Sequence, residues 1–185
     1  MSESVCPPWV GFLLASPLRK LAHDPVAILS PYVHEGMTVL DLGSAMGFFS
    51  LPLAHLVGES GRVICVDLQE KMLASLKKRA SREGLLSRIE TRVCRADSLG
   101  LADLGGGADF ALAFAVVHEV PEAKRFFGEI YSALKSDGTF LFSEPRGHVK
   151  RDAFDRSVFL ARSVGFSVKG EPKIRRSHSV LMARS

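Results

Sequence analysis

The chain has 185 residues, of which 46% are hydrophobic and 24% are charged, and its formal net charge is +4. This length suits one domain that buries its own core, and this composition excludes a disordered chain. No apolar run reaches the roughly 20 residues that a transmembrane helix needs, which excludes a membrane span. Cys6, Cys65 and Cys94 lack the spacing of metal ligands, and their odd number indicates a reducing compartment. We therefore expect a cytoplasmic protein without a bound metal.

The first 35 residues differ in pattern from the remainder. Ser16-Pro17 and Asp24-Pro25 each place a helix-capping residue before a proline, which predicts short helices at both positions. We expect residues 1–35 to form a helical lid segment that leans on a domain of residues 36–185. Trp9 and residues 12–14 would give this segment an apolar face, which also fits core packing or a homodimer contact.

From residue 38 onward, short apolar segments alternate with amphipathic ones, which is typical of a parallel sheet covered by helices on both faces. Strands are predicted at residues 38–42, 62–66, 89–93, 109–117 and 139–143, with two closing strands at 166–168 and 179–182. Helices are predicted at residues 48–56, 71–83, 123–134 and 152–164, and a turn at Asp137-Gly138. The fold class is therefore α/β.

A loop with the sequence Gly43-Ser44-Ala45-Met46-Gly47 follows the first predicted strand. Glycine adopts positive φ without steric cost and lets the backbone approach a ligand closely. In open α/β sheets, ligands bind beyond the carboxyl ends of the strands, where this loop would lie. Asp67 ends the second predicted strand, where a carboxylate can accept hydrogen bonds from both hydroxyls of a ribose. Loop and carboxylate together predict an adenosine-containing cofactor.

The spacing of the loop disfavours NAD. A dinucleotide fold would use G-x-G-x-x-G, so that the pyrophosphate meets the N-terminus of the following helix, and Gly43 to Gly47 does not have that spacing. Asp41, two positions before Gly43, would repel a pyrophosphate but would suit a cofactor that carries an ammonium group. The residues therefore favour a nucleoside that bears an amino acid.

These motifs resemble those of the class I S-adenosylmethionine-dependent methyltransferases, of the UbiE-like or type 11 kind, over about residues 36–145. The first three motifs are matched by residues 39–47, where Ala45 replaces a glycine, by residues 63–67 and by residues 95–98. The fourth-strand motif is matched by residues 109–119, and the turn before the fifth strand by residues 134–139, with changed turn residues. The resemblance implies a Rossmann-like sheet of seven strands, six parallel and one antiparallel.

The resemblance also implies that the chain binds S-adenosylmethionine and releases S-adenosylhomocysteine. Asp67 would bind the ribose, while the Asp97 side chain and the Ala96 backbone would meet the adenine. The expected cofactor-binding residues are Asp41, Gly43, Ser44, Ala45, Gly47, Phe48, Asp67, Leu68, Met72, Ala96, Asp97, Ser98 and Phe114. Asp41 and Asp97 also fit strand-end, capping or turn positions, and Phe48 and Met72 also fit a hydrophobic core.

Methyl transfer is an in-line displacement that needs a general base only when the acceptor loses its proton early. Candidate residues must follow the fourth or the fifth strand. His118 and Glu144 are the expected catalytic residues, with Arg146 and His148 close to them in the sequence. Each of these side chains also fits a solvated or loop position, since they form no recognisable catalytic constellation.

The acceptor is expected to be a small molecule. From Arg146 onward there are ten Lys and Arg residues against three Asp and Glu, which suits an anionic partner or protects edge strands from pairing with other molecules. We favour protection of the edges, so nucleic acid is an open but disfavoured partner. The alternatives are a methyltransferase that acts on RNA or protein, and a cofactor-binding protein with a regulatory or scaffold role. A homodimer stays open.

Overall fold

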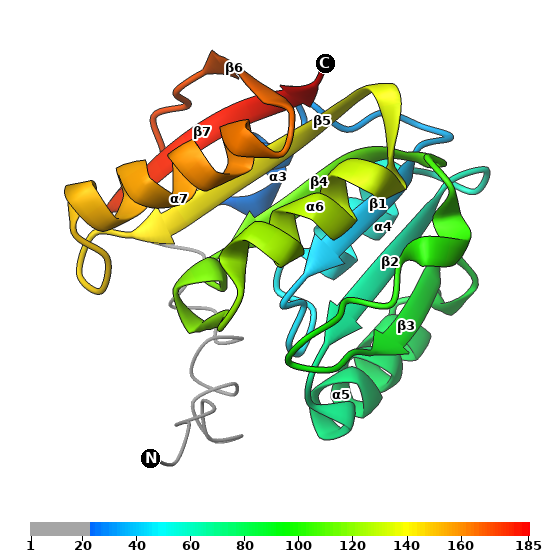
Figure 1. Cartoon of the computed structure of the whole chain (residues 1–185). Helices are drawn as coiled ribbons and strands as arrows, with labels where there is room; N and C mark the ends of the chain where they lie inside the picture. The colour runs from blue at the N-terminus through cyan, green and yellow to red at the C-terminus, as the bar shows by residue number, and fades with distance from the viewer. Residues whose placement is uncertain (1–22) are drawn as a thin grey trace.

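A seven-stranded sheet forms the centre of residues 23–185, which are the residues that the computed structural model describes (Figure 1). Its strands are β1 (Thr38–Leu42), β2 (Arg62–Asp67), β3 (Ile89–Val93), β4 (Ala108–Phe114), β5 (Leu134–Pro145), β6 (Phe166–Gly170) and β7 (Ser177–Arg184). They lie in the order β3-β2-β1-β4-β5-β7-β6. Within this described sheet, β7 is antiparallel to both neighbours and the other six strands run parallel to one another. The predicted fold class is confirmed.

Helices cover both faces of the sheet (Figure 1). They are α3 (Pro25–Leu29), α4 (Ser50–Leu56), α5 (Glu70–Arg82), α6 (Ala123–Ala133) and α7 (Arg151–Ser163). The described residues also form short 3-10 turns in the connections: η1 (Leu86–Arg88), η2 (Ala102–Leu104) and η3 (Val117–Glu119). Within residues 23–185, no helix combines the length and the apolar character that crossing a bilayer requires.

The hydrophobic core has two halves, one on each face of the sheet. Leu40 of β1 packs with the buried side chains of α6 and α7, whereas its neighbour Val39 packs with those of α3, α4 and α5. Successive side chains of a strand point to opposite faces, so a strand buried on both faces is apolar at nearly every position. This explains why the central strands were recognisable as mostly apolar runs.

The N-terminal part of the described chain packs into the same core. Asp24 caps α3 by accepting hydrogen bonds from the backbone N–H groups of Val26 and Ala27, as its Asp-Pro pair predicted. Leu29 and Val33 are buried against the α4 side of the sheet. The predicted Ser16-Pro17 helix and the apolar face from Trp9 to Leu14 lie outside the described residues.

The structure corrects the predicted end of the fourth strand and the predicted turn before the fifth strand. The strand predicted at residues 109–117 ends at Phe114, because Ala115 has a φ of +59° and leaves the extended conformation. The turn predicted at Asp137-Gly138 lies inside β5, which begins at Leu134. Between the pairs Ala108–Leu134 and Phe110–Thr139 the register shifts, so the extra residues of β5 bulge out of the ladder.

The Gly47→Ala substitution should destabilise the protein more than Gly84→Ala. Both glycines have positive φ, +86° and +70°, so each alanine variant loses about 1–2 kcal/mol to backbone strain. At Gly47 the new Cβ would also lie 2.2 Å from Cδ1 of the buried Leu76, whereas nothing lies within 4 Å of a Cβ at Gly84. Overpacking adds about 1–3 kcal/mol. Urea unfolding measures the difference, and equal losses in the two variants would contradict the packing described.

Candidate active site

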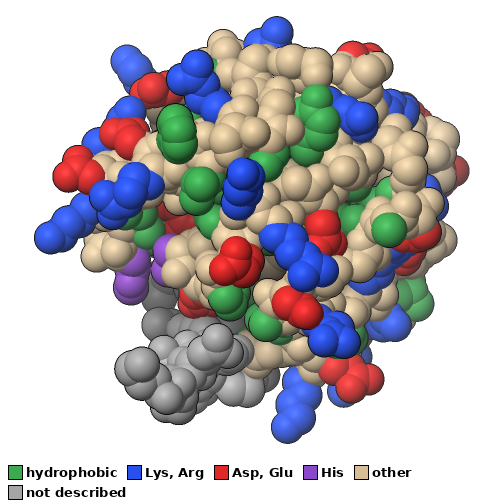
Figure 2. Space-filling view, in the orientation of Figure 1, with side chains coloured by type: hydrophobic (Ala, Val, Ile, Leu, Met, Phe, Trp, Pro, Cys, Tyr) green, Lys and Arg blue, Asp and Glu red, His purple; other side chains and the backbone are tan. Residues whose placement is uncertain are grey.

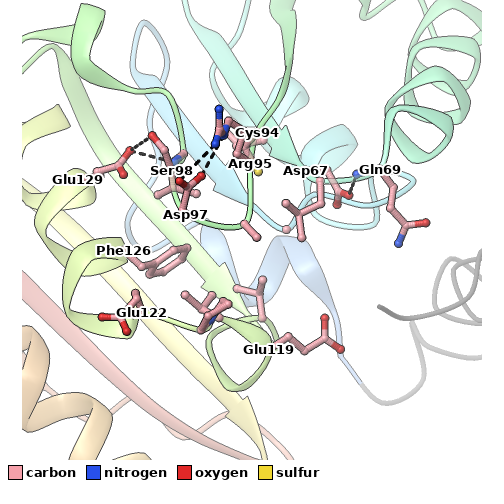
Figure 3. Close-up of a pocket in the computed structure, with 18 of the residues that line it drawn as sticks. Asp67, Gln69, Cys94, Arg95, Asp97, Ser98, Glu119, Glu122, Phe126 and Glu129 are labelled. Carbon is pink, nitrogen blue, oxygen red and sulfur yellow. Dashed lines mark hydrogen bonds and ion pairs between the residues drawn. The ribbon is translucent and has the colours of Figure 1, made fainter. Parts of the chain in front are cut away.

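A cavity of about 620 Å³ opens where the carboxyl ends of β1, β2, β3 and β4 meet (Figure 3). Parallel strands place these ends at one edge of the sheet, which is where open α/β folds bind ligands. The cavity is bounded by the loops that follow the four strands and by one face of α6. Eight of the expected cofactor-binding residues line it: Gly43, Ala45, Asp67, Leu68, Met72, Ala96, Asp97 and Ser98.

The glycine-containing loop is folded tightly against the end of β2. The backbone N–H groups of Gly43 and Ser44 both donate to the carbonyl oxygen of Val66, at 2.9 and 3.1 Å. Gly43 has a φ of +73°, and a Cβ on it would lie 2.7 Å from Cγ2 of Val116. Ala45, which replaces a glycine of the motif, has a φ of +46°. A non-glycine residue in this conformation stores strain, which is typical of functional loops.

Asp67 joins this loop to the loop after β2. Its Oδ2 accepts the backbone N–H of Ala45 and its Oδ1 accepts that of Gln69, both at 2.8 Å. Burial raises the pKa of Asp67, because a charged carboxylate loses solvation there, while the two backbone hydrogen bonds oppose this rise. Each carboxylate oxygen retains a further lone pair. Asp67 lines the cavity and so presents two hydrogen-bond acceptors to a ligand.

Five expected cofactor residues do not line the cavity in the described structure: Asp41, Ser44, Gly47, Phe48 and Phe114. Asp41 is 3% exposed and accepts a 2.5 Å hydrogen bond from Ser50 at the start of α4. It therefore links the end of β1 to the helix that follows the glycine-containing loop. Phe114 packs against Phe49, and Phe49 also packs against Phe48. These aromatic side chains belong to the hydrophobic core on one face of the sheet.

The loop after β3 forms the opposite wall of the cavity. Ala96, Asp97 and Ser98 all line it. Asp97 is exposed and pairs with Arg95 at 3.0 Å from Nε to Oδ1, as the dashed lines of Figure 3 show. The hydrogen bond from Arg95 lowers the pKa of Asp97, so this side chain is a carboxylate at neutral pH. Asp97 therefore offers oxygen acceptors at the rim of the cavity.

His118 and Glu144, which follow β4 and end β5, are in direct contact. Nδ1 of His118 lies 2.6 Å from Oε2 of Glu144. Glu144 is 1% exposed, and its Oε1 accepts the backbone N–H of Val117 at 2.8 Å. The hydrogen bond that His118 donates to the Glu144 carboxylate raises the pKa of His118. His118 lines the cavity, so the buried carboxylate holds a partly buried imidazole at its edge.

The cavity also contains residues that sequence reasoning did not single out for it. Arg125, Phe126 and Glu129 of α6 line it, together with Cys94 at the end of β3. Glu129 lies four positions after Arg125 and three positions after Phe126, so it neighbours both on the helix surface, and this spacing was the available signal. Phe126 was assigned to the core, which its 6% exposure supports. Burial raises the pKa of Cys94 to about 11, so its thiol stays protonated.

Residues 23–185 hold no group of three or more His, Cys, Asp or Glu side chains arranged to bind a metal ion. The cavity instead combines carboxylates, backbone groups in two loops, and the apolar side chains of Met72 and Phe126. Such a mixture suits a small molecule with both polar and apolar parts.

A family model described as a methyltransferase domain matches residues 33–167. The ubiquinone/menaquinone biosynthesis C-methyltransferase UbiE of Klebsiella pneumoniae is 28% identical over 130 residues, which cover 69% of this chain and 51% of that protein. An arsenite methyltransferase of Halobacterium salinarum is 31% identical over 109 residues, 59% of this chain and 27% of that protein. The chain thus spans about half the length of the UbiE relative and less of the other.

Solved structures show the same fold. A SAM-dependent methyltransferase from Aquifex aeolicus superimposes with a TM-score of 0.87 at 23% sequence identity. The alignment covers 98% of this chain and 100% of that one. At this level of identity the likeness concerns the fold, and it extends over the closing strands β6 and β7 as well as the first half of the sheet.

The Glu144→Gln substitution should lower the pKa of His118, because the charged partner of the imidazolium is removed. Glu119→Gln is the matched control: its carboxylate lies 3.9 Å from Nε2 of His118 and contributes less to the raised pKa. Titration of the His118 ring protons by NMR measures both effects. An equal shift of the pKa in the two variants would show that the contact between Glu144 and Nδ1 is not the main cause of the raised pKa of His118.

The same contact gives stability a definite pH dependence. The folded pKa of His118 is raised above its unfolded value of about 6.5, so protonation favours the folded state. The stabilisation is complete below that unfolded value and is lost as pH rises through the folded pKa. Urea unfolding of the wild type at several pH values should show this loss, which should shrink in Glu144→Gln. A pH dependence that is unchanged in the variant would contradict the assignment.

Proposed function

Since the chain belongs to the family of class I S-adenosylmethionine-dependent methyltransferases, we propose that it transfers a methyl group from S-adenosylmethionine to a small-molecule acceptor. The observation that carries the proposal is the Asp67 carboxylate, which lines the cavity while it ties the glycine-containing loop to the end of β2. A carboxylate at this place in the sheet is suited to binding the two hydroxyls of a ribose.

The residues present fit this cofactor. Gly43 and Ala45 bring the backbone of the loop to the cavity with little side-chain bulk. Gly43 has no room for a side chain, because a Cβ there would overlap Val116. Ser44 lies in the same loop, and its buried Oγ has no hydrogen-bond partner in the described structure. We propose that this loop receives the amino-acid end of the cofactor, and that the negative charge of Asp41 beneath it favours the ammonium group. Cavities of about 300–1,000 Å³ hold ligands of such size.

The adenine end is proposed to lie between the loops after β2 and β3. Leu68 and Met72 supply an apolar surface on one side, and Ala96 supplies backbone groups on the other. The carboxylate of Asp97 would accept a hydrogen bond from the exocyclic amino group of adenine. Asp97 can do so while it stays paired with Arg95, because a carboxylate has four acceptor positions.

The cofactor, when bound, supplies a methyl group made electrophilic by the positively charged sulfur. The protein must place the acceptor in line with it and exclude water. Because Nδ1 of His118 donates to Glu144, the other ring nitrogen, Nε2, is available to accept a proton from the acceptor. We propose that His118 is the general base and that Glu144 is the residue that fixes its orientation. The rate of methyl transfer should then rise with pH through the raised pKa of His118.

Two observations favour a small acceptor over a macromolecule. The relatives named above are a quinone-biosynthesis C-methyltransferase and an arsenite methyltransferase, and both names describe reactions of small molecules. His118 also lies at the rim of an indented cavity, and its ring stacks with that of His148 at 6.2 Å between centroids. A molecule that reaches Nε2 of His118 has to enter between such side chains.

Binding of S-adenosylhomocysteine tests the proposal. At about 100 times its dissociation constant a ligand adds roughly 2.7 kcal/mol, which should raise the melting temperature by about 5–10 °C for a domain of this size. Asp67→Asn should abolish the shift, because the amide keeps the size but loses one acceptor and the charge. Asp103→Asn is the control, because Asp103 is an exposed partner of Arg92 away from the cavity.

NADH serves as the second ligand in the same melting experiment. A shift with S-adenosylhomocysteine alone supports the assignment of the cofactor, and a shift with NADH alone overturns it. Binding of bulk RNA at two salt concentrations addresses the acceptor. Weak binding is expected; tight binding with a steep salt dependence would contradict the small-molecule proposal.

A further inference from the structure

Glu129 of α6 is hydrogen-bonded to the loop that follows β3. One carboxylate oxygen, Oε2, accepts the backbone N–H of Leu99 at 2.9 Å and the hydroxyl of Ser98 at 3.2 Å. The side chain of Glu129 is only 22% exposed, and it lines the cavity. Figure 3 shows this contact beside the pair formed by Arg95 and Asp97. A charged acceptor with two donors forms a strong anchor.

The loop after β3 contains a short turn that is hydrogen-bonded to other elements at both ends. At its start, the backbone N–H of Cys94 donates to the carbonyl oxygen of Asp67 at 3.0 Å. Arg95 and Ser98 then exchange two backbone hydrogen bonds, which close a narrow turn. Ala96 and Asp97 form the tip of this turn. The end of the turn is the part that Glu129 holds.

Glu129 is itself held in place. Its other oxygen, Oε1, lies 3.5 Å from Nε of Arg125, one helical turn earlier. Phe126 and Ile130, which flank it on α6, are 6% and 0% exposed, so the helix is fixed against the sheet. The end of the turn, at Ser98, is therefore held by α6, whereas its start, at Cys94, is held by the end of β2.

We propose that Glu129 is a positioning residue for the adenine ring: it holds the turn of residues 95–98 so that Ala96 and Asp97 face the base. This inference rests on the proposed function, because it assumes that the cavity binds S-adenosylmethionine. Without the carboxylate, the N–H of the buried Leu99 loses its acceptor, and the turn must shift to find another one. The carboxylate of Asp97 would then no longer be held where the amino group of adenine meets it, and preorganisation is lost.

Two nucleosides that differ only at the base provide the test. S-inosylhomocysteine has an oxygen in place of the adenine amino group, so it cannot donate a hydrogen bond to Asp97 from that position. The wild type should bind S-adenosylhomocysteine about tenfold more tightly than S-inosylhomocysteine, the value of one good hydrogen bond. Isothermal titration calorimetry measures both dissociation constants.

Glu129→Ala should lose most of this preference for adenine, with the ratio of the two dissociation constants falling toward one. Glu129→Gln should keep it, because its amide oxygen accepts the same two hydrogen bonds. A merely structural role would weaken the binding of both nucleosides alike, so an unchanged ratio in Glu129→Ala overturns the inference. Failure of the wild type to bind either nucleoside would instead overturn the proposed function, which makes the two failures distinguishable.

Discussion

The carboxylate of Asp67 accepts one backbone hydrogen bond from the loop after β1 and one from the loop after β2. The two loops belong to neighbouring parallel strands, whose register places Leu42 beside Val66 just before them. A single side chain therefore sets the distance between the backbone of Ala45 and the backbone of Gln69. The arrangement of the loops at this edge of the sheet depends on this link, because the glycine-containing loop is otherwise hydrogen-bonded to β2 through one carbonyl oxygen, that of Val66.

The carboxyl edge of the sheet divides into two halves with different chemistry. On the side of β1, β2 and β3, carboxylates and backbone groups face the cavity, which suits a nucleoside with a positive charge. On the side of β4 and β5, the buried Glu144 holds the imidazole of His118. The half that would bind the cofactor is made mainly from loops, and the half that would bind the acceptor from side chains at two strand ends.

Much of the fold could be predicted from the sequence, because the strands of a sheet covered on both faces are continuous apolar runs. Asp67 was recognisable because it ends such a run at a fixed distance from Gly47. The burial of Phe114 could not be predicted, since an apolar residue at a strand end fits the cavity wall and the core equally well. The contact of Glu129 could not be predicted, because its partner Leu99 lies thirty positions earlier in the chain. No local sequence pattern connects a helix to a turn at that separation.

The central claim is that the loops after β1, β2 and β3 form one binding site for S-adenosylmethionine. Hydrogen–deuterium exchange of the whole chain, with and without S-adenosylhomocysteine, tests it most directly. Amides of residues 43–47, 67–69 and 95–99 should become protected together on binding, because the ligand would contact all three loops. Protection confined to the basic region after Arg146, or an absence of protection in the three loops at saturating ligand, would contradict the claim.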